Sequence, residues 1–130
     1  MKKMEKQITQ YLTERGWDNL RPVDVAKSIM IEGAELLELF QWHNATFDEV
    51  RADKKKVEEI KKELADILIY AFDMSVLLGL DTEKIMSDKI VAIKKKYPAA
   101  LMRKNAKKDS GSGEDSEYLR IKKEYRRKGK

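Results

Sequence analysis

A chain of 130 residues without cysteine excludes disulfides, zinc–thiolate sites and a thiol nucleophile, and its length favours one domain. The net charge of +5 belongs to the C-terminal end, because residues 103–130 hold 11 Lys/Arg against 5 Asp/Glu and the remainder holds 17 against 18. The net positive charge of the chain is therefore no argument that the domain before this end binds nucleic acid. The N-terminus lacks an apolar signal core, and no apolar run approaches the roughly 20 residues of a membrane span. We expect a cytoplasmic protein without membrane association.

Hydrophobic periodicity predicts an all-α fold, a bundle of four to five helices, with no strand or hairpin pattern. The predicted helices cover residues 4–15, 22–43, 54–78 and 81–96. The connection over 44–54 is polar with only a weak helical tendency. Gly79 favours the end of the third helix, and Tyr97-Pro98 the end of the fourth. The third helix carries an apolar stripe that includes Leu64 and Leu68.

The composition changes after residue 103. Residues 105–116 contain S-G-S-G and several acidic residues, which is typical of a flexible linker. Residues 117–128 are compatible with a short basic helix that is too short to be stable alone in water. The sequence thus predicts a helical domain over 1–103 and a basic flexible tail over 104–130.

Two acidic pairs lie among apolar residues in the second and third predicted helices. Glu32 with Glu35, and Glu63 with Asp66, are each spaced i,i+3, which places both carboxylates of a pair on one helix face. Long helices joined by a short connection tend to pack antiparallel, so we expect the two pairs to face each other. Four carboxylates among core residues repel unless a cation offsets their charge. Oxygen ligands suit Mg²⁺, and we predict a Mg²⁺ site made of these four residues.

A simpler interpretation is a solvated helix face on which acidic residues alternate with lysines. Asp66 argues against it, because this residue lies inside the apolar segment A-D-I-L-I-Y-A-F. A ferritin-like di-iron centre would need two Glu-x-x-His pairs, and the single histidine, His43, belongs to no such motif. Further along the third helix the polar stripe continues through Tyr70 and Asp73.

Two aromatic residues and two lysines are further candidates. Trp42 lies seven residues after Glu35, about 10 Å along nearly the same helix face, where it either stacks on a nucleobase or belongs to the core. Trp17, near a helix junction, leaves the same two interpretations open. Lys89 and Lys96 share a face of the fourth predicted helix, where they either neutralise phosphate oxygens or are solvated.

The two acidic pairs belong to an ordered set of motifs. They form the pattern E-x-x-E…E-x-x-D, flanked by W-D-N-L-R-P, E-L-L-E-L-F-Q-W, E-L-A-D-I-L-I-Y and K-Y-P. This set resembles the MazG-like, all-α nucleoside triphosphate pyrophosphohydrolases over about residues 4–103. The resemblance implies metal-dependent cleavage of a nucleoside triphosphate between the α and β phosphates, in nucleotide pool control or house-cleaning. It also implies Mg²⁺, with Mn²⁺ as an alternative, and a homodimer or a dimer of dimers.

The resemblance assigns roles to individual residues. It implies the metal ligands Glu32, Glu35, Glu63 and Asp66, the base-contacting residues Trp42 and Trp17, Tyr70 beside the substrate, and Lys89 and Lys96 near phosphate. A metal-activated water would attack the α-phosphorus, and a carboxylate would accept its proton. Glu35 is our candidate for that base, with Glu38 and Glu59 as alternatives.

Two other classes of function are compatible with the sequence. The chain could be a non-catalytic nucleotide-binding or regulatory helical module. It could also bind nucleic acid through its basic tail. The preferred base, the sugar and the number of metal ions stay open.

Overall fold

The computed structural model describes residues 1–106 and 116–129, and the chain divides into two compact units, Met1–Glu83 and Lys84–Lys130. The described residues form helices and no strand, which confirms the predicted all-α fold. None of the helices in these ranges combines the length and the apolar character needed to cross a membrane.

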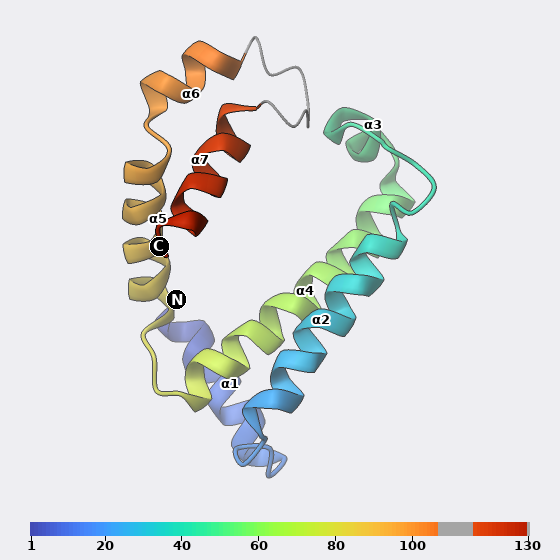
Figure 1. The fold of residues 1–130 in the computed structure, drawn as a ribbon. Coiled ribbons are helices and arrows are strands. Elements are labelled where there is room, and N and C mark those ends of the chain that lie inside the picture. Colours follow the sequence, from blue (N-terminus) through green and yellow to red (C-terminus); the bar gives the residue numbers. More distant parts are fainter. Residues whose placement is uncertain (107–115, 130) are drawn as a thin grey trace. The chain divides into compact units, whose positions relative to one another are not determined.

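The first unit is built on a long pair of helices (Figure 1). Its helices are α1 (Lys2–Glu14), α2 (Pro22–Glu38), α3 (Phe47–Ala52) and α4 (Lys54–Leu77). α2 packs along α4, α1 packs against the C-terminal half of α4, and the short α3 contacts α4 near its start. The predicted helices over 4–15 and 54–78 are confirmed as α1 and α4.

α2 and α4 are antiparallel. Near one end of the pair, the Lys56 ammonium donates a hydrogen bond to the carbonyl oxygen of Leu39 at 2.9 Å. At the opposite end, Val25 and Asp73 line the same cavity. Residue numbers therefore rise along α2 as they fall along α4, and the middle turns of the two helices lie opposite each other.

Local sequence signals fix most helix ends in this unit. Pro22 occupies the first turn of α2, where a missing N–H costs no hydrogen bond. Thr46 and Glu49 form a capping box at the start of α3, and the Asp53 side chain caps α4. Gly79, with φ +67°, adopts the left-handed conformation that ends α4, as predicted.

A small polar network ties the start of α1 to the end of α4. The backbone N–H of Thr82 donates a hydrogen bond to Oε1 of Glu5 at 2.8 Å, and the hydroxyls of Ser75 and Thr82 are 2.7 Å apart. Hydrogen bonds from the side chain and the backbone of Thr82 lower the pKa of Glu5. The network thus joins α1 and the start of α5 to the end of α4.

The second unit is built around stacked aromatic rings. It contains most of α5 (Thr82–Lys96), with α6 (Ala99–Ala106) and α7 (Glu117–Arg127). Tyr97 and Tyr118 stack with ring centroids 5.0 Å apart, and the Lys96 ammonium lies 4.7 Å from the centroid of Tyr125. Ile121 of α7 is buried. The predicted fourth helix and the short basic helix over 117–128 are confirmed.

Three boundaries differ from the predictions. The second predicted helix, 22–43, is too long, because α2 ends at Glu38 and tight i→i+3 turns follow over 39–43. The connection over 44–54 contains α3. α6 was not predicted, and it takes up the first two residues of the expected linker over 105–116, while 107–115 lie outside the described residues.

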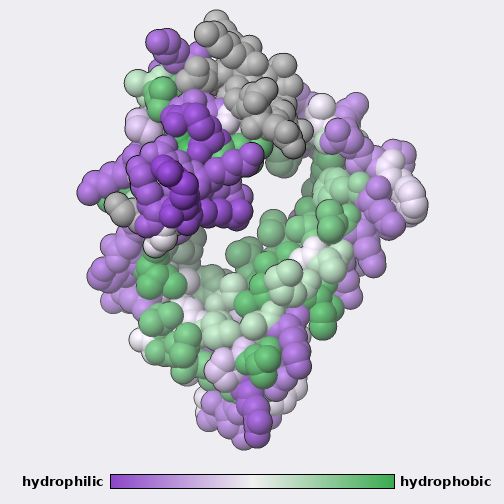
Figure 2. Space-filling model, viewed as in Figure 1, coloured by the Kyte–Doolittle hydropathy of each residue, from purple (hydrophilic) through white to green (hydrophobic). Residues whose placement is uncertain are grey.

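Few apolar side chains are buried. In the described parts of the chain the buried aliphatic residues are Ile8, Leu12, Val25 and Ile121. Leu64 and Leu68, from the apolar stripe of α4, remain 45% and 50% exposed. Figure 2 shows hydrophobic surface running along α2 and α4. Within the first unit, the side of α4 that carries these two leucines is left largely exposed.

Candidate metal centre

The two acidic pairs meet at the middle of the α2–α4 interface. Glu32 from α2 and Glu63 and Asp66 from α4 each offer one carboxylate oxygen, and the three oxygens lie within 4.8 Å of one another. The i,i+3 spacing within Glu63/Asp66 puts both on one face, and the antiparallel packing brings Glu32 to that face. The structure therefore brings together three of the four residues predicted to bind metal.

Glu35 adjoins this cluster. Its carboxyl lies within hydrogen-bonding reach of both Glu32 and Glu63. Burial, the contact with Glu35 and the charges of the neighbouring carboxylates raise the pKa of Glu32 and the pKa of Glu63. Two carboxyl groups can hydrogen-bond only when one of them keeps a proton. The metal-free cluster thus favours bound protons.

The cluster fits a divalent cation. Its donors are all carboxylate oxygens, the ligand type that Mg²⁺ and Mn²⁺ prefer over nitrogen and sulfur. The raised pKa values of Glu32 and Glu63 agree with burial and with a mutual repulsion that the charge of Lys62 offsets only in part, and a cation would relieve that repulsion in place of protons.

Glu38 and Glu59 contribute no oxygen to the converging group of three. Glu38 is exposed at the last position of α2. Glu59, one turn before the cluster on α4, forms an ion pair with Lys56 at 3.8 Å. Lys89 and Lys96 lie on α5 in the C-terminal unit, and their role near phosphate stays a prediction.

Trp42 lies in the turn after α2 and is 82% exposed. This exposure excludes it from the core of the first unit, which was one of the two interpretations. Trp42 and His43 line a shallow cavity of about 420 Å³. An exposed indole at this position is compatible with stacking on a base.

Trp17 and Tyr70 share a smaller cavity of about 220 Å³. Trp17 is 44% exposed and meets the ring of Tyr11 edge to face, with centroids 5.6 Å apart. Asp73 lies in the same cavity, and no role was predicted for it. Its place in the polar stripe of the third helix was the available signal.

Comparisons with known proteins agree with this geometry. The model of the MazG-like family matches residues 27–111, which include both acidic pairs. The solved structure of a pyrophosphatase from Archaeoglobus fulgidus DSM 4304 is similar, with 30% sequence identity and a TM-score of 0.66. The similarity covers 75% of this chain and 92% of that one. No curated protein matches the chain. The chain belongs to the MazG-like family.

Proposed function

We propose that this chain is a hydrolase that converts a nucleoside triphosphate and water into the nucleoside monophosphate and pyrophosphate. The observation behind the proposal is the convergence of Glu32, Glu63 and Asp66, with Glu35 beside them, between two helices of a MazG-like chain. The pyrophosphatase similarity supports hydrolysis of a phosphoanhydride bond.

The four carboxylates would hold Mg²⁺, or Mn²⁺ in its place. Bound there, the metal would supply charge neutralisation for the phosphate oxygens and lower the pKa of a coordinated water. The three converging oxygens of Glu32, Glu63 and Asp66 are the best-placed ligands.

Glu35 would accept the proton of the attacking water. It contacts Glu32 and Glu63, yet it contributes no oxygen to the group of three, so it is the carboxylate least committed to a metal. Glu38 and Glu59 are weaker candidates, because the first lies one turn further along α2 and the second is paired with Lys56. Attack at the α-phosphorus breaks its bond to the bridging oxygen and releases pyrophosphate.

A panel of ribo- and deoxyribonucleoside triphosphates, scored for both monophosphate and pyrophosphate, tests the proposal with and without Mg²⁺ or Mn²⁺. Glu63→Gln and Asp66→Asn should each abolish pyrophosphate release while the helical circular dichroism spectrum is retained. Glu58→Gln is the matched control, since Glu58 is an exposed α4 residue that pairs with Lys61. Full activity in the Glu63 or Asp66 variant contradicts the assignment. A wild-type chain that binds nucleotides but releases no pyrophosphate is a non-catalytic module.

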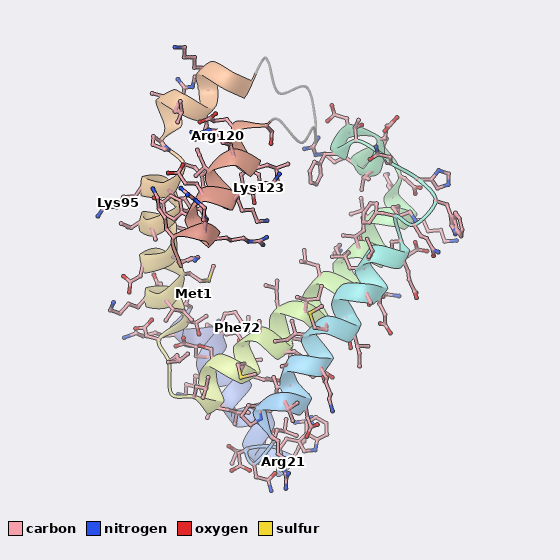
Figure 3. All side chains as sticks on the ribbon, viewed as in Figure 1. Met1, Arg21, Phe72, Lys95, Arg120 and Lys123 are labelled. Atoms are coloured by element: carbon pink, nitrogen blue, oxygen red, sulfur yellow. The ribbon has the colours of Figure 1, made fainter. Side chains whose placement is uncertain are left out.

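We also propose that the chain assembles as a homodimer or a dimer of dimers through the uncovered apolar surface. An apolar groove of about 720 Å³ lies between α1 and α4, with Met4, Leu68 and Phe72 in its walls. Phe72 is labelled in Figure 3. Apolar surface of this extent favours association. Leu68→Lys should yield a monomer in sedimentation equilibrium, and an unchanged oligomer would contradict the choice of surface.

A second candidate function concerns the C-terminal unit. Residues 84–130 hold 16 Lys/Arg and 6 Asp/Glu, whereas 1–83 hold 12 and 17. Figure 2 shows hydrophilic surface over α7, where Arg120 and Lys123 are labelled in Figure 3. Such a surface favours nucleic-acid phosphates. The double substitution Lys123→Glu and Arg127→Glu should abolish a salt-sensitive mobility shift of single-stranded RNA or DNA, and the wild type must show that shift.

A further inference from the structure

Three aromatic rings line the cavity between α1, the start of α2 and the end of α4. They belong to Tyr11, Trp17 and Tyr70, and the cavity measures about 220 Å³. Ligand pockets for drug-sized molecules are larger, about 300–1,000 Å³. A flat aromatic group such as a nucleobase suits this space better than a whole nucleotide does.

Asp73 lies in this cavity with an unsatisfied carboxylate. The residue is 2% exposed, and within the described ranges Oδ1 of Asp73 is the buried side-chain atom that lacks a hydrogen-bond partner. Burial raises the pKa of this carboxyl. The hydroxyls of Ser75 and Ser28 are engaged elsewhere, since Ser75 pairs with Thr82 and Ser28 donates to the carbonyl oxygen of Asp24. The phenols of Tyr11 and Tyr70 line the cavity together with this carboxylate. A buried polar atom without a partner is rare and unfavourable in a folded protein, and a donor on a bound ligand would satisfy it.

Two residues of this cavity also line a second cavity, which reaches the acidic cluster. Tyr11 and Tyr70 also line a neighbouring cavity of about 450 Å³ that includes Asp66. Asp66 and Asp73 are two turns apart on one face of α4, about 10 Å at 1.5 Å per residue. A nucleotide whose phosphates lie beside Asp66 would therefore reach Asp73 with its base, if the base lies about 10 Å from the phosphates.

We propose that this cavity recognises the base of the nucleotide and that Asp73 selects bases carrying an amino group, namely adenine, cytosine or guanine. The proposal rests on the proposed function for the identity of the substrate. An ionised carboxylate only accepts hydrogen bonds, and these three bases offer amino N–H donors. Thymine and uracil offer one imide N–H between two carbonyl oxygens, which the Asp73 oxygens would repel.

Trp42 does not explain such a selection. It is 82% exposed, and every base has a face on which an indole can stack. Stacking on Trp42 would add affinity for all nucleotides alike, whereas the Asp73 carboxylate distinguishes them by their donors.

Calorimetric titration of the full chain tests the proposal at a fixed Mg²⁺ concentration. The probes are AMP, CMP and GMP against UMP, and their deoxy counterparts against dTMP. At least one amino-bearing base should bind about tenfold more tightly than uracil or thymine, the lower end of what a hydrogen bond to a charged group contributes. Equal affinities, or tighter binding of UMP or dTMP, would overturn the proposal.

Asp73→Asn tests the residue, because the amide has the same shape without the charge. In this variant the affinities for amino-bearing bases and for uracil or thymine should differ by at most about threefold. The change should come from weaker binding of the amino-bearing bases. Removing a buried unpaired carboxylate should also leave Tm unchanged or raise it, an effect opposite to that of removing a structural residue. Asp73→Ser is the second variant if the first fails to fold, and Asp18→Asn, an exposed loop carboxylate, should bind like the wild type. A variant at Asp73 that retains the full preference would refute the role.

Pyrophosphate release on the matching triphosphates separates the two proposals. Base-selective binding that depends on Asp73, without hydrolysis, leaves the inference intact and removes the proposed function. Hydrolysis of all triphosphates at similar rates, with binding equally indifferent to the base, leaves the function intact and removes the inference.

Discussion

Gly33 tests whether the space beside α2 at the acidic cluster is open in solution. It lies inside α2, between Glu32 and Glu35 of the acidic cluster. Among the described residues, a Cβ added to Gly33 would meet no atom within 4 Å beyond the helix's own backbone. Glycine in a helix interior costs about 0.5–1 kcal/mol relative to alanine. Gly33→Ala should therefore raise the free energy of unfolding by about that amount.

The expected shift in Tm follows from chain length. An unfolding entropy of about 2.1 cal/mol/K per residue gives roughly 0.27 kcal/mol/K for this chain. A gain of about 0.5–1 kcal/mol then raises Tm by about 2–4 °C. Thermal melts by circular dichroism at equal protein concentration measure the shift. Ala34→Gly, at the next and exposed position of α2, is the control and should lower Tm by a similar amount.

A lower Tm for Gly33→Ala would refute the reasoning, because it would mean that a second copy fills the space beside Gly33. The rate of pyrophosphate release gives a second readout. A more stable variant with impaired turnover would show that substrate approaches the α2 backbone at Gly33, since the added methyl group leaves the helix itself intact.

Three further predictions concern charge in the first unit. The pKa values of Glu32 and Glu63 are raised in the folded state, so the metal-free chain loses stability as the pH rises through these pKa values. Mg²⁺ should therefore raise Tm more at pH 7.5 than at about pH 5 in scanning fluorimetry. An equal rise in Tm at the two pH values would contradict this. Hydrogen exchange should slow in the middle turns of α2 and α4 when Mg²⁺ is added, and slowing confined to other helices would argue against the site. The lowered pKa of Glu5 gives a pH dependence of stability with the opposite sign. Glu5 stabilises the fold at pH values above its unfolded pKa near 4.5, and this stabilisation is lost as the pH falls through its folded pKa. Glu5→Gln should therefore lower the urea midpoint at pH 7, and its difference from the wild type should shrink below about pH 4.

The sequence predicted the helices whose ends carry strong local signals. Pro22, Gly79 and Pro98 restrict the backbone whatever surrounds them, so α2, α4 and α5 begin or end close to the predicted residues. The C-terminal end of α2 lacks such a signal, and there the prediction was five residues too long. α6 follows Pro98 directly and has no apolar periodicity long enough to be recognised.

The acidic cluster was predictable because its geometry depends on two local facts. Each pair lies on one helix face by its own spacing, and the antiparallel packing of neighbouring helices then aligns the pairs. Asp73 follows Asp66 by seven residues and so lies on the same face of α4, but its burial depends on Tyr11 and Trp17, which are more than 50 residues away in the chain. Periodicity along α4 could not distinguish a solvated carboxylate from one enclosed by α1.

The α2–α4 pair combines two features that oppose each other. Its middle turns hold carboxylates whose mutual repulsion favours separation of the helices. One end of the pair is joined by the Lys56–Leu39 hydrogen bond, and the other end of α4 is tied to α1 through Ser75, Thr82 and Glu5. These contacts lie outside the cluster, so they can hold α4 in place while the carboxylates repel one another. Lys62 offsets part of the charge at Glu63, and the remaining repulsion is left for a metal ion to relieve. A helix pair held only by its apolar face would have to relieve the same repulsion by moving apart.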